Sequence, residues 1–245
     1  MKKCVFITGV FIALLFFSAC KKQSETYITP PLSDYFPLQI GKYVTYDLDS
    51  LTFVNFGESF LTTHYQVQYY TDDTITDNIG RKEYVIIRYI RNTPLDPWVA
   101  DNTFTAVNTG NTIEWVEDNL RFIKLAEPIV EGFSWNGNSY IDASSLTSNL
   151  TYLYGWSYNY DSLNVPLTLD SITVDSTIKV NEDNEIQGDP GNPNAFSEID
   201  YSSENYAKGI GLVYRNFLHQ EYQTDSSAEP GYHGYGITLT MIDHN

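Results

Sequence analysis

The chain has 245 residues, and its 31 acidic residues far outnumber its 14 lysines and arginines, which gives a formal net charge of −17. Such a chain repels phosphate backbones, and no basic cluster lies beyond the lysines near its start, so the composition argues against nucleic-acid binding. The acids are scattered through expected turns, which favours a role in solubility over a cation site. Aromatic residues make up 15% of the chain, including 20 tyrosines, and this favours strands over helices.

The first 20 residues have the layout of a secretory signal peptide. Two lysines precede an apolar run, residues 5–17, that is too short to span a bilayer. Leu15–Cys20 then resembles the lipobox of bacterial lipoproteins, with small Ser18 and Ala19 before the cysteine and with Phe17 where the family usually has leucine. The resemblance implies that Cys20 is diacylated and becomes the mature N-terminus. A secreted protein without lipid and a retained helix are the alternatives.

The lipobox divides the chain into three expected parts. Residues 1–19 are a signal peptide, residues 20–33 are the acylated cysteine with a flexible tether that contains Pro30 and Pro31, and residues 34–245 are a single β domain. Cys4 leaves with the signal, so no disulfide can form within the mature chain. Two or three acyl chains attach a protein durably to a bilayer. We therefore expect an anchor in the cell outer membrane, facing either the periplasm or the outside.

Short runs of alternating apolar and polar residues predict strands through most of the chain. One break in the alternation predicts a bulge near Asp49–Ser50. Residues 81–91 are apolar on both faces and predict a central strand, whereas 92–111 and 181–205 read mainly as loops and 143–154 as the best helix or a further loop. The expected strands are 44–53, 64–70, 81–91, 104–107, 112–116, 120–125, 155–160, 165–169, 172–180, 209–222 and 235–242.

These strands follow one another closely, and no convincing long amphipathic helix separates them. Residues 112–116 and 120–125 form an expected hairpin, and Asn136-Gly137 is a strong turn signal. The pattern predicts an all-β, mainly antiparallel fold with little helix, either a curved half-barrel or a β-sandwich.

Three segments resemble an uncharacterised family of bacterial outer-membrane lipoproteins. These are the opening Tyr35–Tyr46, the late strand Tyr206–Tyr214 and the mid-chain turn Trp135–Asn138. The resemblance implies an antiparallel β fold, similar to the half-barrel of periplasmic lipoprotein carriers. It implies no activity and no catalytic residues.

A search for catalytic and metal-binding patterns finds no complete set, so we expect no catalytic residue, no metal and no cofactor. Ser134 lies in a segment like a hydrolase nucleophile elbow, but Asn136 replaces the second glycine. The 4 histidines are far apart and lack metal-ligand spacing, and a calcium-like loop at 183–194 lacks the final glutamate. Asp47 and Asp49 lie on one expected strand face about 7 Å apart, within the range of inverting glycosidases.

Two further patterns point to binding or modification. Trp156, Tyr158 and Tyr160 share one face of an expected strand, which suits either a stacking platform for a glycan or ordinary sheet packing. Aspartate followed by serine or threonine resembles an O-glycosylation acceptor of exported proteins in some bacteria, although Asp-Ser also begins many turns. The acceptor positions of this pattern are Ser50, Thr74, Ser162, Ser171 and Ser176.

The sequence therefore predicts a lipid-anchored, non-enzymatic envelope protein. Its β domain is expected to bind an apolar molecule, a glycan or another envelope protein. The alternative is an exported hydrolase, such as a glycosidase acting through Asp47 and Asp49.

Overall fold

The computed structural model describes residues 29–145, 149–224, 227 and 230–245. The expected signal peptide, Cys20 and most of the expected tether lie outside these residues. Within the described part, no helix is long and apolar enough to cross a membrane.

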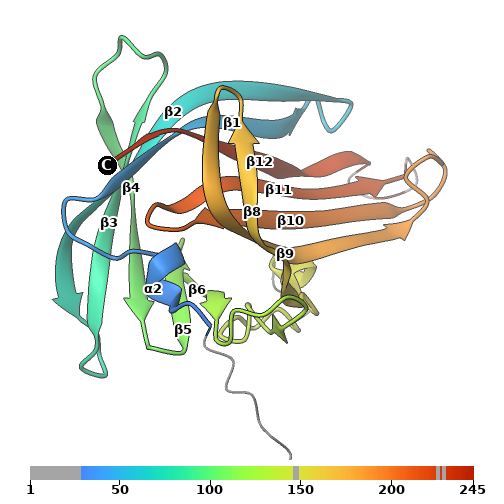
Figure 1. Cartoon of the computed structure of the whole chain (residues 1–245). Coiled ribbons are helices and arrows are strands. Elements are labelled where there is room, and N and C mark those ends of the chain that lie inside the picture. Colours follow the sequence, from blue (N-terminus) through green and yellow to red (C-terminus); the bar gives the residue numbers. More distant parts are fainter. Residues whose placement is uncertain (1–28, 146–148, 225–226, 228–229) are drawn as a thin grey trace, which may run out of the picture.

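The fold is one antiparallel sheet of 12 strands, which confirms the all-β prediction (Figure 1). Two meanders, β1 to β6 and β7 to β12, are joined where β1 pairs with β12. The strands are β1 Tyr43–Val54, β2 Ser59–Thr76, β3 Lys82–Arg91, β4 Val99–Asn108, β5 Thr112–Glu117, β6 Leu120–Ala126, β7 Ser134–Trp135, β8 Tyr158–Leu169, β9 Ile172–Gly188, β10 Ser197–Ala207, β11 Gly211–Gln223 and β12 Gly231–His244.

The sheet curls until its two edges meet, so it is nearly a closed barrel and not a sandwich (Figure 1). The Ile123 amide of β6 donates a hydrogen bond to the Gly137 carbonyl at 2.7 Å, and the Trp135 indole N–H of β7 donates to the Ile123 carbonyl at 2.8 Å. Gly137 is needed at this join because a Cβ there would lie 2.4 Å from the Tyr158 ring. Closure protects the edge strands and encloses an interior.

A short helix, α2 Leu32–Tyr35, packs against one end of the barrel (Figure 1). Leu32 and Tyr35 are buried, and the Tyr35 hydroxyl donates to Asn164 Oδ1 of β8 at 3.0 Å. The folded part therefore begins before residue 34, where the sequence places the start of the domain.

The many tyrosines supply much of the core. Tyr46, Tyr158, Tyr160 and Tyr206 are among the largest fully buried side chains. A buried tyrosine needs a partner for its hydroxyl, and Tyr160 finds one by donating to the Ala126 carbonyl at 2.8 Å. The same bond ties β8 to β6 across the join of the barrel.

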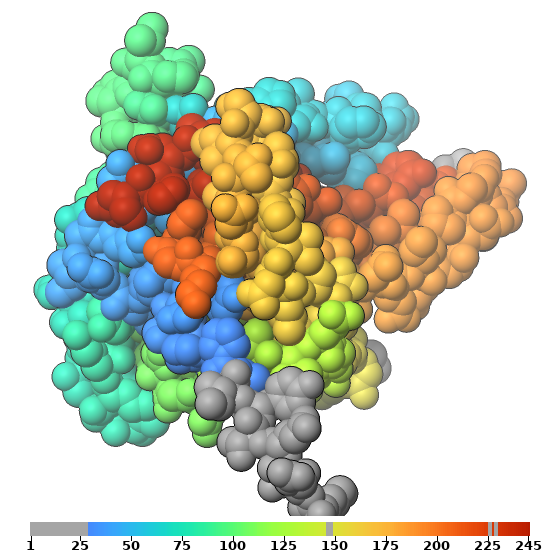
Figure 2. Space-filling model, in the orientation of Figure 1, coloured from blue at the N-terminus to red at the C-terminus, as the bar shows by residue number. Residues whose placement is uncertain are grey.

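The β8–β9 hairpin folds back over the rest of the sheet, as Figure 2 shows. Near its tip, Leu169 and Val174 are buried in one cluster with Ala207 and Val213 of β10 and β11. This contact fixes β8 and β9 relative to the other strands.

Several sequence predictions of local structure are wrong. Residues 181–205, predicted as a surface loop, are the end of β9, a turn and most of β10, and β4 occupies much of the predicted loop 92–111. Residues 143–154, interpreted as a helix or a further loop, have one 3-10 turn at Thr151–Leu153 and no longer helix among their described residues, which exclude 146–148. The bulge in β1 lies at Thr45/Tyr46 against β12 and not near Asp49–Ser50.

Candidate functional site

An ion cluster lies buried inside the barrel. Lys124 Nζ of β6 lies 2.8 Å from Glu182 Oε1 of β9 and 2.8 Å from Glu204 Oε1 of β10. The three side chains are only 6%, 2% and 2% exposed. The Ser202 hydroxyl donates to Glu182 Oε2 at 2.6 Å, and the Tyr206 hydroxyl donates to Glu204. The carboxylates are therefore held by hydrogen bonds as well as by charge.

Arg215 of β11 extends the ion cluster to the other half of the sheet. Its Nη1 lies 3.2 Å from Glu117 Oε2 of β5, and its Nε lies 3.6 Å from Glu204 Oε1. The Arg215 Nε atom is buried and has no hydrogen-bond partner. We call Lys124, Glu182, Glu204, Arg215 and Glu117 the ion cluster from here on.

Opposite charges decide which members of the ion cluster are ionised. Burial acts to lower the pKa of Lys124, but Glu182 and Glu204 outweigh burial and raise it. Burial acts to raise the pKa of Glu204, but Lys124 and Arg215 outweigh it and lower this pKa. For Glu182, burial and then the charge of Glu204 raise the pKa. The interior thus keeps fixed cations at Lys124 and Arg215.

The largest of the cavities beside the ion cluster has a volume of about 710 Å³, within the range of about 300–1,000 Å³ usual for small-molecule sites. The β3–β4 loop contributes Asn92, Asp96 and Pro97 to its lining. Apolar and aromatic side chains share its walls with charged ones. The lining includes Leu48, Tyr65, Tyr69, Ile90, Ile237 and Leu239 together with Arg88, Asp101, Glu117 and Arg215.

Two smaller cavities adjoin the same charges. One of about 180 Å³ is lined by Trp156, Tyr158 and Phe217, and one of about 80 Å³ lies near α2 and is lined by Phe36 and Tyr206. Glu117 and Arg215 line all three cavities. The interior therefore combines apolar walls with a charged centre, an arrangement that suits an amphipathic molecule better than a purely apolar one.

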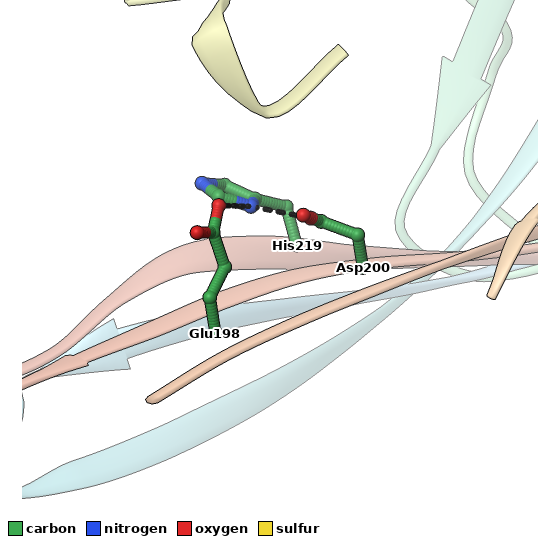
Figure 3. A group of neighbouring side chains, drawn as sticks. All are labelled: Glu198, Asp200 and His219. Carbon is green, nitrogen blue, oxygen red and sulfur yellow. Dashed lines mark hydrogen bonds and ion pairs between the residues drawn. The ribbon is translucent and has the colours of Figure 1, made fainter. Parts of the chain in front are cut away.

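A second cluster of polar side chains, Glu198, Asp200 and His219, lies on the inward face of β10 and β11 (Figure 3). His219 Nδ1 lies 2.7 Å from Asp200 Oδ1 and 4.0 Å from Glu198 Oε1. The Tyr152 ring stacks on the imidazole with 4.2 Å between ring centroids. Burial, and then the charge of Asp200, raise the pKa of Glu198.

Asp183 of β9 adds an isolated carboxylate to this face. Burial and the nearby charges of Asp200 and Glu185 raise its pKa to about 6, and its Oδ2 atom is buried without a hydrogen-bond partner. An ionised Asp183 therefore destabilises the folded state above that pH.

Asp183→Asn is expected to stabilise the protein at pH 7–8 by about 1 kcal/mol, a value reduced for solvent screening because the side chain is only partly buried. Since the pKa of Asp183 is higher in the folded state than its ordinary value of 3.8, wild type gains stability relative to the variant as the pH falls through 6 toward 4. Urea unfolding across this range measures the difference. A difference that does not change with pH would contradict the prediction.

The residues of the hydrolase alternative lie outside this interior. Asp47 accepts a hydrogen bond from Gln66 Nε2 at 2.9 Å, and Asp49 lies 2.5 Å from His64 Nδ1. Asp47, Asp49 and Ser134 are exposed, and none of them lines the cavities described above.

The aromatic stripe is buried. Trp156, Tyr158 and Tyr160 are 5%, 0% and 1% exposed and belong to the core. They cannot form a surface platform for a glycan, and the packing alternative describes their position. Trp156 precedes β8, which begins at Tyr158, so the three residues do not share one strand. Their side chains nevertheless belong to the same interior cluster.

The calcium-like loop is also absent, because Asp183–Gly188 are the end of strand β9. The proposed glycosylation positions are spread over the fold. Ser171 lies in the β8–β9 turn, Ser50 lines the large cavity, and Thr74, Ser162 and Ser176 lie in strands. Their modification stays a prediction, as does lipid attachment at Cys20.

No family model matches the chain, and no curated protein matches it. Among solved structures, the chain is similar to a Bacteroides fragilis protein described as exported and as having a YmcC-like fold. That alignment covers 85% of this chain and 99% of the other at 10% sequence identity, with a TM-score of 0.40. The resemblance to outer-membrane lipoproteins rests on the sequence segments alone.

Proposed function

We propose that this protein is anchored by lipid at Cys20 in the bacterial outer membrane and binds a small amphipathic molecule inside its β domain, without catalysing a reaction. The observation that carries the proposal is the cavity of about 710 Å³ beside the ion cluster. Its size suits a small molecule, and its walls combine apolar and charged side chains.

The residues of the large cavity indicate the chemistry of its ligand. Leu48, Ile90 and Leu239 offer aliphatic surface, and burying apolar area gains roughly 25 cal/mol per Å². Arg88 and Arg215 offer guanidinium groups, which favour a carboxylate or phosphate. A molecule with an apolar chain and one acidic group satisfies both parts of the lining.

The other functions considered from the sequence have less support. The aromatic side chains proposed to stack on a glycan, Trp156, Tyr158 and Tyr160, are buried and so are not available on the surface. A hydrolase using Asp47 and Asp49 would have to act on the exposed outer face of β1, away from the cavities, where these carboxylates already pair with Gln66 and His64.

Filling the cavity with a larger side chain tests the proposal. Ser50 lines the cavity, so Ser50→Trp is expected to weaken the binding of a fluorescent long-chain fatty acid by at least about tenfold. His64→Trp is the matched control, because its side chain lies on the neighbouring strand and is 74% exposed. Native mass spectrometry of the soluble Cys20→Ser protein, purified without detergent, should show one bound molecule.

Equal affinities of Ser50→Trp and wild type would contradict binding inside the barrel. Absence of any bound or displaceable amphiphile in wild type would contradict the function itself. Circular dichroism and thermal unfolding of both variants would establish that a loss of binding is not a loss of fold.

A further inference from the structure

Strand pairing brings three possible metal ligands together on the inward face of the barrel. Glu198 and Asp200 are two residues apart on β10 and so share a face, and His219 of β11 lies directly opposite Asp200. One nitrogen or oxygen atom from each residue lies within 4.8 Å of the other two. Figure 3 shows both carboxylates beside the same imidazole nitrogen.

The carboxylates of Glu198 and Asp200 form no ion pair with a lysine or arginine among the described residues. Among the described residues, their ion pairs are with His219, which is charged only when protonated. Asp200 is 5% exposed, so water screens its charge poorly. By contrast, the buried carboxylates Glu182 and Glu204 have Lys124 between them.

A further carboxylate increases the negative charge at this place. Asp183 lies opposite Ser202 on the neighbouring strand β9, and Ser202 is two residues from Asp200 on β10. Its Oδ2 atom is buried and has no hydrogen-bond partner. Asp183 adds negative charge near Asp200, but it is not among the residues whose ligand atoms lie within 4.8 Å of one another. Two carboxylates and an imidazole beside this extra charge form a set that a divalent cation would satisfy.

We propose that Glu198, Asp200 and His219 bind a divalent transition-metal ion, Zn²⁺ or Mn²⁺. One imidazole nitrogen with carboxylate oxygens suits these ions better than Ca²⁺ or Mg²⁺, which prefer oxygen ligands alone. Bonds of about 2.0–2.2 Å place ligand atoms roughly 3–4 Å apart. The present separations need side-chain movements of only about 1 Å to reach that geometry.

The surroundings hold the histidine in the required orientation. The Tyr152 ring stacks on the imidazole, and its hydroxyl lies 3.3 Å from the Tyr235 hydroxyl of β12. The metal takes the place of the proton on His219 Nδ1, and three protein ligands leave a coordination position for water or another molecule.

Calorimetric titration of the metal-stripped, acylated protein with Zn²⁺ and with Mn²⁺ tests the site. One ion per chain is expected. His219→Gln should lower the affinity about 100-fold or more, and Glu198→Gln, which keeps the Asp200–His219 pair, should lower it about tenfold or more. His64→Gln is the matched control, because His64 also contacts one aspartate on a neighbouring strand, Asp49, but no third ligand.

A second readout separates ligation from folding. Co²⁺ bound through His219 should give visible absorption bands that are kept in His64→Gln and lost in His219→Gln, while the circular dichroism of all variants stays that of wild type. Weak binding of several ions per chain, or equal loss in His64→Gln and His219→Gln, would overturn the proposal. Its outcome does not depend on whether the large cavity binds an amphiphile.

Discussion

Lys124→Met is expected to lower the free energy of unfolding by about 3–5 kcal/mol. Methionine keeps the length of the side chain but removes the cation that lies 2.8 Å from both Glu182 and Glu204. Both carboxylates would then share a buried space with Arg215 as their nearest cation, 3.6 Å from Glu204. Removing one partner of a buried ion group costs far more than the net contribution of the group, because the remaining charges stay desolvated.

Chemical unfolding at pH 7, followed by circular dichroism, measures this loss. Lys179→Met is the matched control, since Lys179 Nζ lies 3.1 Å from Asp161 on the exposed surface, and such pairs contribute about 1 kcal/mol or less. The triple variant Lys124→Met, Glu182→Gln, Glu204→Gln should regain much of the stability, because it removes the charges together. A cost for Lys124→Met no larger than that for Lys179→Met would show that the ion cluster is not strongly desolvated.

The sequence predicts the parts of the fold in which one strand face is apolar. Residues 112–116 and 120–125 alternate clearly, and they form the β5–β6 hairpin with nearly the expected bounds. Residues 81–91, apolar on both faces, form β3, which pairs with strands on both sides. In such segments, the side-chain period of 2 and the turn residues decide the local structure without knowledge of the partners.

The same reasoning fails where the inward face is polar. Glu182, Ser202 and Glu204 point into the barrel and are buried, so residues 181–205 show no apolar periodicity although most of them lie in strands. Only their partners across the barrel make this burial possible. A signal was nevertheless present at Lys124, a charge flanked by the apolar pairs Phe122-Ile123 and Leu125-Ala126. A charged residue at such a position must find a counter-charge if it is buried.

The metal-binding group could not be predicted from spacing for a related reason. Metal-ligand motifs are recognisable when the ligands lie on one helix or one loop. Here Glu198 and Asp200 come from β10, and His219 joins them only through the register of β10 against β11. The register depends on the turn between the strands and on the whole closed sheet.

Cys20→Ser is expected to move the protein from the membrane fraction to the soluble fraction almost completely. The lipobox resemblance implies that Cys20 carries the acyl chains that hold the protein on the membrane. Cell fractionation with immunoblotting measures the distribution, and mass spectrometry of the N-terminal peptide measures the lipid. Retention of the variant in membranes would contradict the anchor.

The fold limits how far the domain can lie from that anchor. The Thr29 hydroxyl donates to Glu127 Oε2 at 3.1 Å, and Leu32 is 2% exposed, so only residues 21–28 separate Cys20 from the folded part. Even a fully extended segment of this length reaches no more than about 30 Å. The predicted tether, which ran to residue 33, was too long.

The anchor and the cavity should therefore be separable in one experiment. The β3–β4 hairpin, whose loop lines the large cavity, and helix α2 at the start of the fold lie toward opposite ends of the domain (Figure 1). An anchored domain can thus hold this loop away from the bilayer, where a ligand arrives through water. Soluble Cys20→Ser should bind the fluorescent fatty acid as tightly as acylated wild type does. An affinity lowered about tenfold or more would show instead that the acylated anchor contributes to ligand binding.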